Sequence, residues 1–296
     1  MNFNDMYIDF ITKSQKYLKE YDKENLKKLI NEYHQFSRNI IPKYYSKEFL
    51  EPLGKMFVEN YIEVLKFINK KDFNEKAKEE VSFKKIVIEK KIESLFHFTT
   101  EKNLLSILDN GIVPVNMHVS MNIYSEHNDH QRMDNKLDYS SISISFPNYK
   151  LFWNFREIYK NTNWGVLLIS PDLLFSESNY FLFYDKNAAS GPNNLKSEKE
   201  LNTFNSFKNM FGPYKENKDK IVEREELDIP DNYTTNPQAE ILVKGIISPS
   251  FIREVHFYED VNNNETIHLY KKKHPEIIFS LNNYYFKPRK DWHFWK

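Results

Sequence analysis

Cysteine is absent from the 296 residues, and its absence excludes several kinds of site at once. Without thiols the chain can form no disulfide, no thiolate-bound metal site and no cysteine nucleophile. Glycine is also scarce, with six residues, and neither GxGxxG nor GxxxxGK[ST] occurs, so a glycine-rich phosphate-binding loop is not expected. A chain without disulfides fits a reducing cytoplasm, which is its expected location.

The chain has no net charge and no long apolar run. Because 42 Lys and Arg balance 42 Asp and Glu, a polyanionic partner must be bound by a local patch rather than by a global attraction. No apolar run approaches the roughly 18–20 residues of a membrane helix, and the opening MNFNDMYIDF lacks the regions of a signal peptide. We expect a soluble protein that does not contact a membrane.

The first 90 residues are predicted to be helical, because apolar side chains recur there every three or four positions. They form two stripes: Met6, Phe10, Tyr17, Tyr21 and Leu29, then Phe49, Leu53, Phe57, Tyr61, Leu65 and Ile68. From Phe83 the spacing shifts toward two, through Ile86, Val87 and Ile88, which indicates the start of a β-rich region. We predict a helical N-terminal extension at 1–90, which covers the second domain or docks a partner, and a second domain at 91–296.

The stretch from Glu93 to Gly111 combines a strand, a polar turn and a helix. Its first part, LFHF, has strand-forming bulk, and His97 points to the face opposite its two Phe neighbours. Thr99 and the next residues supply helix-capping groups, four apolar residues follow at helical spacing, and Asn110-Gly111 ends the helix. Taken alone, His97 is compatible with a structural histidine at a strand end as well as with a site residue.

A polar loop from Val115 to Leu137 contains three histidines, several carboxylates and Arg132. The spacing matches neither HExxH nor HxxxH, so no metal is predicted. Next, residues 139–146 alternate Tyr or Ser with apolar residues, which predicts a half-buried strand with a row of hydroxyls on one face. This row suits either a polar cleft or a solvated sheet face.

Several further segments have the patterns of regular structure. Residues 150–159 and the Phe204, Phe207, Phe211 series predict short helices, while 165–170, 180–187, 251–258 and 266–270 predict strands. Glu240 stands where a polar loop becomes the buried strand ILV, so its carboxylate lies at the mouth of a strand. The tail from Tyr284 mixes Lys287, Arg289 and Trp292 with other aromatics, a mixture that suits single-stranded nucleic acid or a docked C-terminus.

Four motifs in order resemble the DarT family of nucleic-acid ADP-ribosyltransferase toxins. They are FHFTTEKNLLSILDNG at 96–111, an Arg before the next strand (Arg132), NAAS at 187–190 and QAEILV at 238–243. The resemblance covers about residues 93–258. It implies an α+β fold with an ADP-ribosyltransferase-like core of two packed, mainly antiparallel sheets and a cleft between them, over about residues 91–280.

The resemblance also implies the chemistry and its residues. ADP-ribose would move from NAD⁺, as co-substrate without a metal, to a base of single-stranded DNA or RNA, and an antitoxin protein would restrain the activity. The catalytic residues would be Glu240, which stabilises the oxocarbenium-like state, and Arg132, which pairs with the diphosphate or assists proton removal. The other implied contacts are His97, Thr99, Asn103 and Tyr139 with NAD⁺, and Asn187, Ser190, Lys287, Arg289 and Trp292 with nucleic acid.

Two other functions remain compatible with the sequence. One is an ADP-ribosyltransferase that modifies a protein side chain. The other is a non-catalytic nucleic-acid-binding module that uses the basic aromatic tail and consumes no NAD⁺.

Overall fold

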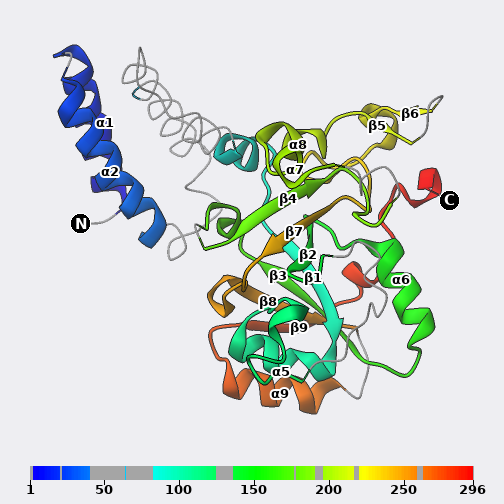
Figure 1. The fold of residues 1–296 in the computed structure, drawn as a ribbon. Coiled ribbons are helices and arrows are strands. Elements are labelled where there is room, and N and C mark those ends of the chain that lie inside the picture. The colour runs from blue at the N-terminus through cyan, green and yellow to red at the C-terminus, as the bar shows by residue number, and fades with distance from the viewer. Residues whose placement is uncertain are drawn as a thin grey trace. The chain divides into compact units, whose positions relative to one another are not determined.

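The computed structural model describes residues 3–20, 22–40, 64, 83–124, 136–176, 178–190, 196–216, 220–258 and 263–295 (Figure 1). The chain divides into two compact units, residues 1–89 and 90–296. In the first unit, α1 (Phe3–Lys19) and α2 (Lys23–Ile40) pack together through the buried side chains of Phe10 and Leu29. Both residues belong to the first predicted apolar stripe. All six residues of the second stripe lie outside the described residues.

Residues 83–89 are helical, so the strand-like spacing expected from Phe83 is wrong. Ile86 and Val87 are both buried, whereas Ile88 is exposed. Alternate residues share a face in a strand, but here two neighbours are buried together, as a helix allows. The β-rich region begins with β1, at Leu95.

One seven-stranded sheet, in the order β4-β7-β2-β1-β3-β8-β9, forms the centre of the second unit. Neighbouring strands are antiparallel except β8 and β9, which are parallel. The strands are β1 (Leu95–Thr100), β2 (Tyr139–Ile144), β3 (Trp164–Ile169), β4 (Tyr180–Tyr184), β7 (Glu240–Lys244), β8 (Ile252–Phe257) and β9 (Ile278–Leu281), beside a separate hairpin of β5 (Tyr214–Lys215) and β6 (Ile221–Val222).

Helices accompany this sheet, and the α+β class predicted from the sequence is confirmed. The α-helices of the second unit are α5 (Glu101–Asn110), α6 (Tyr149–Ile158), α7 (Glu198–Leu201), α8 (Phe204–Asn209) and α9 (Asn263–Lys273). Short 3-10 helices occupy Val115–Met117, Pro171–Phe175, Arg224–Leu227, Pro249–Phe251, Tyr284–Phe286 and Trp292–Trp295. No described helix is both long and apolar enough to cross a membrane.

The sheet consists of two arms that are joined at one narrow place. One arm is β1-β3-β8-β9, the other is β2-β7-β4, and the join between β1 and β2 consists of two residue pairs, Leu95 with Ile144 and Phe96 with Ser143. Beyond Phe96, β1 continues to pair with β3 while β2 continues to pair with β7. The prediction of two packed sheets is therefore wrong: the structure has one sheet, whose two arms separate next to His97 because β1 and β2 pair through only two residue pairs.

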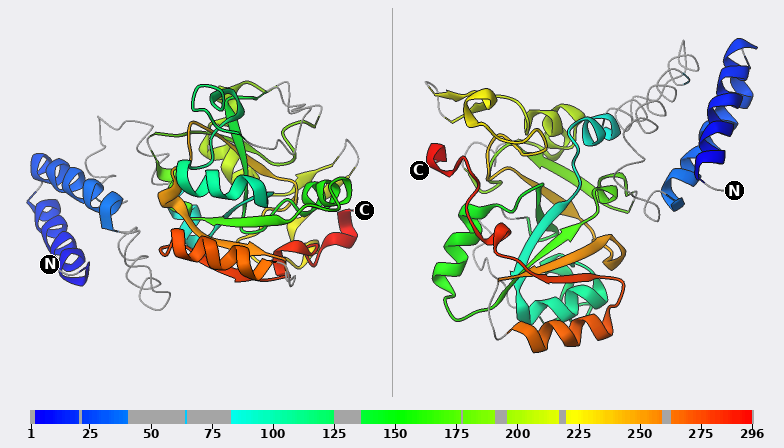
Figure 2. Two further views of the ribbon diagram at one scale, coloured as in Figure 1. Left: turned by 90° about the horizontal axis from the view of Figure 1, so that it is seen from below. Right: turned by 180° about the vertical axis from the view of Figure 1, so that it is seen from behind.

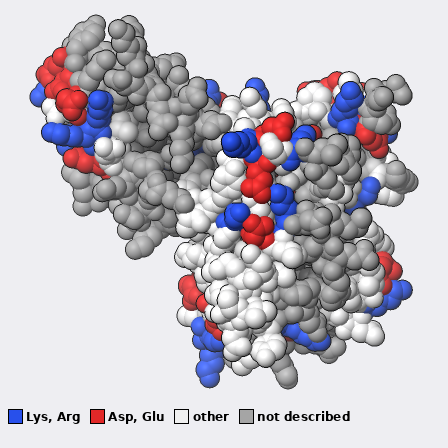
Figure 3. All heavy atoms as spheres, viewed as in Figure 1, with Lys and Arg blue, Asp and Glu red and all other residues white. Residues whose placement is uncertain are grey.

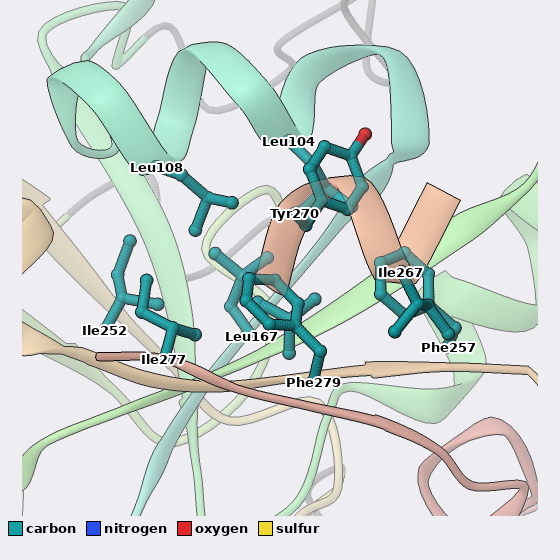
Figure 4. Packing of buried hydrophobic residues seen from close by; sticks show 10 residues of the cluster. Leu104, Leu108, Leu167, Ile252, Phe257, Ile267, Tyr270, Ile277 and Phe279 are labelled. Carbon is teal, nitrogen blue, oxygen red and sulfur yellow. The ribbon is translucent and has the colours of Figure 1, made fainter. Parts of the chain in front are cut away.

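An apolar layer fixes α5 and α9 on one face of the first arm (Figure 4). Leu104 and Leu108 of α5 point toward Leu167 of β3 and toward residues of β8 and β9. Gly165 allows this close packing, because a Cβ there would lie 2.9 Å from Cδ1 of Leu104. The α5 helix ends at Gly111, which adopts a φ of 87°, a conformation that suits glycine.

Aromatic side chains cover the other face of this arm. Phe96 and Phe98 pack there with Phe152 of α6 and Trp164, as the alternation around His97 predicts. Phe286 joins the same cluster, so the C-terminal segment lies beside α6 (Figures 1 and 2). The aromatic content of the chain thus stabilises a core that connects α6, β1 and the C-terminal segment.

One predicted strand is a helix in the structure. Residues 266–270 lie within α9, where Ile267 and Tyr270, three positions apart, are both buried against the core that contains Phe257 and Phe279. The spacing of three in a short apolar pattern fits one helix face, and the tertiary contacts select it. The strand that follows, β9, was not expected from the sequence.

Candidate active site

A cavity of about 210 Å³ opens where the two arms separate. Its walls come from β1, α5, the segment 111–123, β2, α6, the turn after β4 and the start of β7. Six of the predicted site residues line it: His97, Thr99, Asn103, Tyr139, Asn187 and Glu240. The fold therefore brings a strand histidine and a strand-mouth glutamate together across 143 positions of sequence, since both strands border the same opening.

Glu240 is 5% exposed, and both of its carboxylate oxygens accept hydrogen bonds. The Ser141 hydroxyl donates to Oε2 and the backbone N–H of Ala188 donates to Oε1. These two donors hold the carboxylate in one orientation. A buried, oriented negative charge is the group needed where positive charge develops in a reaction.

The motif at 187–190 forms the tight turn that supplies one of these donors. The side-chain oxygen of Asn187 accepts from the N–H of Ala189 at 2.8 Å, and the Ser190 hydroxyl donates to the Asn187 carbonyl at 2.7 Å. This closed turn directs the N–H of Ala188 toward Glu240. Asn187 and Ala189 line the cavity, whereas Ser190 does not.

His97 bridges the place where the two arms separate. Its Nδ1 lies 2.9 Å from the carbonyl oxygen of Ser141, and because a carbonyl can only accept, Nδ1 carries the proton. Burial lowers the pKa of His97, and the hydrogen bond to this carbonyl offsets only part of that effect. The imidazole is therefore neutral near pH 7, and its Nε2 is a hydrogen-bond acceptor.

Thr99 and Asn103 form a polar pair beside His97. The Asn103 amide donates to the Thr99 hydroxyl at 3.1 Å, and both side chains are buried. Thr99 belongs to β1 and Asn103 to the first turn of α5, so the packing of α5 on Gly165 sets their distance. The helix begins where predicted, although the side chain of its N-cap residue, Thr100, makes no capping hydrogen bond.

Tyr139 lines the cavity but is embedded in the second arm. Its ring packs with Leu182 and Leu201, and the ammonium groups of Lys136 and Lys244 lie 5.4 and 5.3 Å from its centroid. Burial, together with the nearby Glu198 carboxylate, raises the pKa of Tyr139, so its hydroxyl stays protonated. This tyrosine supports the wall through its ring.

The remaining predicted contacts lie elsewhere. Arg132 falls outside the described residues, and no Lys or Arg is among the described residues that line the cavity. Lys287 and Trp292 line a second cavity, between α6 and the C-terminal segment. No group of three or more side chains suited to a metal ion occurs in the described part of the chain.

Arg289 contradicts the prediction of a nucleic-acid contact. Its guanidinium is buried and donates to the Asp291 carboxylate and to the carbonyls of Thr234 and Thr235. Asp291 also accepts from the indole N–H of Trp295 at 2.7 Å. A buried arginine in such a network is structural, because exposing it to a phosphate would leave the carboxylate unpaired in the interior.

Ser141 is the site residue that the sequence analysis did not single out. Its hydroxyl orients Glu240 while its carbonyl orients His97, so one residue of β2 connects both groups. The alternating hydroxyls of residues 139–146 were the signal for it. That pattern could not distinguish Ser141 from Ser143, whose hydroxyl accepts from the N–H of Asn148 at 3.2 Å.

The fold and the cavity define a class of protein: an α+β enzyme with a single fixed carboxylate beside imidazole, hydroxyl and amide groups, as transfer from a glycosidic donor requires. A family model described as "ssDNA thymidine ADP-ribosyltransferase, DarT" matches residues 96–294. The chain therefore belongs to the DarT family. The description of this family names ADP-ribosyl transfer to thymidine of single-stranded DNA.

Solved structures with a similar chain path include three DarT complexes. A Thermosipho africanus DarTG in complex with ADP-ribose is 15% identical, with a TM-score of 0.43, and the match covers 66% of this chain but 51% of that one. Thermus sp. 2.9 DarT with ADP-ribosylated ssDNA has 15% identity, coverage of 67% and 97%, and a TM-score of 0.43. The same protein with NAD⁺ is 13% identical, and the match covers 66% of this chain and 98% of that one. Its TM-score is 0.39.

These TM-scores are low, and the assignment depends on the family match alone. This chain spans about half the length of the DarTG chain. No curated protein matches the sequence.

Proposed function

We propose that the cavity between the two arms binds NAD⁺ and that residues 91–296 transfer its ADP-ribosyl group to a thymine of single-stranded DNA. The observation that carries this proposal is the Glu240 carboxylate, which Ser141 and Ala188 hold at the wall of the cavity. The family description supports thymine as the acceptor base. Residues 1–90 form a helical extension that precedes this catalytic domain.

The reaction breaks the bond between C1′ of the ribose and the nicotinamide nitrogen. Nicotinamide leaves with the bonding electron pair as a neutral molecule, and positive charge develops on the ribose. The Glu240 carboxylate stabilises this oxocarbenium-like state, as carboxylates do in glycoside cleavage. A ring nitrogen of thymine then forms a bond to C1′, and its proton passes to water.

The residues beside Glu240 hold the donor. Nε2 of His97 accepts a hydrogen bond from a ribose hydroxyl, since Nδ1 is committed to the Ser141 carbonyl. Thr99 and Asn103 add polar contacts, and the ring of Tyr139 supports the wall. Arg132 pairs with the diphosphate, which suits a guanidinium better than proton abstraction because arginine hardly deprotonates.

Mass spectrometry tests this assignment directly. The protein is incubated with NAD⁺ and a single-stranded oligonucleotide, the DNA is digested, and the nucleosides are weighed. We expect ADP-ribosylated thymidine with the wild type and none with Glu240→Gln. ADP-ribose attached to polypeptide instead of DNA would show that the chain is a protein-modifying enzyme. Binding of DNA without consumption of NAD⁺ would show that it is a binding module.

We also propose that the active chain is toxic to its own cell and that an antitoxin protein restrains it. This follows from membership of a family that includes a protein named DarTG. The helical residues 1–90 and the segment from Tyr284 are the surfaces proposed for docking. Growth after induced expression should stop with the wild type and continue with Glu240→Gln; equal growth of the two strains would contradict toxicity.

A further inference from the structure

A second cavity, of about 480 Å³, lies between α6 and the C-terminal segment, and we call it the α6–tail cavity. Figures 1 and 2 place these two segments side by side. Hydrogen bonds join them, from Lys150 to the Trp295 carbonyl and from Arg156 to the Phe286 carbonyl at 2.7 Å. The walls of the cavity are therefore held by the fold.

The lining of this cavity combines positive charge with indole rings. Its cations are Lys150, Arg156 and Lys287, and no carboxylate is among the described residues that line it. Trp153 and Trp292 also line it, and they are 51% and 46% exposed. The chain as a whole is neutral, and on the face drawn in Figure 3 acidic and basic residues are interspersed. A cavity whose lining carries charge of one sign departs from that average.

Two structural elements connect this cavity with the active site. The α6 helix separates the two cavities: Leu151 and Phe155 line the active site, while Trp153 and Arg156 line the α6–tail cavity. The chain at the start of β7 also adjoins both cavities, because Gln238 lines the second cavity and Glu240, two residues later, lines the first. A flexible polyanion that presents a base to Glu240 can continue past α6 into the second cavity.

We propose that the α6–tail cavity is an accessory subsite that binds nucleotides flanking the reacting thymine. This inference rests on the proposed function, and it deepens it by assigning a second contact to the same DNA strand. Lys287 attracts a phosphate, and its ammonium forms no hydrogen bond or ion pair with the part of the chain that the structure describes. Exposed indoles offer faces on which bases stack, whatever their sequence.

The test uses substitutions that leave the buried network intact. Lys287→Glu and Trp292→Ala change exposed side chains, and Arg289 is avoided because its loss would disturb the fold. The matched controls are Lys290→Glu and Phe294→Ala, two exposed residues of the same segment that do not line the cavity. Each protein is assayed with a trinucleotide that contains one central thymine and with a longer oligonucleotide that contains one thymine.

We expect Trp292→Ala to raise KM for the longer oligonucleotide about fivefold or more, the equivalent of losing one stacked base, with kcat unchanged. Lys287→Glu should also raise KM. Because it removes one phosphate contact, it should lower the slope of log affinity against log salt concentration by about one. All variants should transfer ADP-ribose to the trinucleotide with the same KM and kcat as the wild type. Equal KM effects on both substrates, or equal effects of the control substitutions, would overturn the subsite.

A binding arm separates this inference from the proposed function. Glu240→Gln carrying Trp292→Ala or Phe294→Ala is titrated with a fluorescent oligonucleotide in the absence of NAD⁺. Binding that is weaker for the double variant with Trp292→Ala than for the one with Phe294→Ala supports the subsite. This holds even if no protein transfers ADP-ribose, a result that would refute only the proposed function. Equal binding by both double variants would refute the subsite even if transfer by the wild type is confirmed.

Discussion

The two cavities that share α6 have opposite designs. Among the described residues that line the active site, the charged side chain is the buried Glu240 carboxylate, and donors from two other segments hold both of its oxygens. In the α6–tail cavity the charges are positive, and two indoles and the Lys287 side chain are exposed. Stabilising a transition state needs a fixed charge, because reorientation during the reaction costs free energy. Binding a flexible strand needs accessible surfaces, which tolerate movement.

Glu240→Gln breaks this comparison most strongly. Gln keeps the size of Glu but removes the charge that stabilises the oxocarbenium-like state. We expect the transfer rate to fall on the order of 10²- to 10³-fold, roughly 3–4 kcal/mol of transition-state stabilisation. Single-turnover assays with labelled NAD⁺ measure this fall, and thermal unfolding measures the fold. An unchanged rate would remove Glu240 from the reaction.

Ser141→Ala examines whether the carboxylate must be held. The substitution removes the hydroxyl that donates to Glu240 but keeps the backbone carbonyl that accepts from His97. A hydrogen bond to a charged group contributes about 1.5–3 kcal/mol, so we expect kcat to fall at least about tenfold while KM for NAD⁺ changes little. Ser141→Thr, which keeps the hydroxyl, is the control. An unchanged kcat in Ser141→Ala would show that the Ala188 N–H alone is sufficient to hold the Glu240 carboxylate.

Gly111→Ala probes the backbone that supports the active site. A Cβ at this residue would lie 2.2 Å from the carbonyl oxygen of Ile247, at a φ of 87°. We expect the free energy of unfolding, measured by urea denaturation, to decrease by about 1–3 kcal/mol. Gly212→Ala is the matched control, since its Cβ would meet the Asn209 carbonyl oxygen at 3.7 Å. Equal losses for both would show that the close approach has no energetic weight.

The pH dependence of NAD⁺ binding should be the smallest effect. Burial lowers the pKa of His97 below the ordinary value of about 6.5, so the folded protein keeps a neutral imidazole as an unfolded chain begins to take up the proton. His97 therefore reduces stability as the pH falls below about 6.5 and has no effect above it. Calorimetric titration should give constant NAD⁺ affinity from about pH 8 down to that value.

His97→Gln is the control for this pH dependence. It lacks the titrating group, so the difference in unfolding free energy between the two proteins should change only on the acidic side. The contrary outcome is a wild-type NAD⁺ affinity that already falls between about pH 8 and 6.5, while the affinity of the variant stays constant. It would show that the pKa of His97 is raised instead.

The sequence was sufficient for the local parts of this protein. The strand at His97 and the helix from Glu101 to Asn110 follow from the alternation of residues, helical spacing and a glycine at the C-cap. The same kind of pattern places Glu240 at the start of β7. These features depend on near neighbours in the chain, and the period of the apolar residues reports them directly.

Long-range contacts were decided only by the tertiary structure. Ser141 and the N–H of Ala188 reach Glu240 across 99 and 52 positions, through the order of strands β4, β7 and β2. The burial of Arg289 beside Asp291 likewise depends on where the C-terminal segment packs. No local pattern distinguishes a buried arginine from an exposed one, or one serine of an alternating row from the next. Those choices depend on which distant atoms the sheet brings within hydrogen-bonding distance.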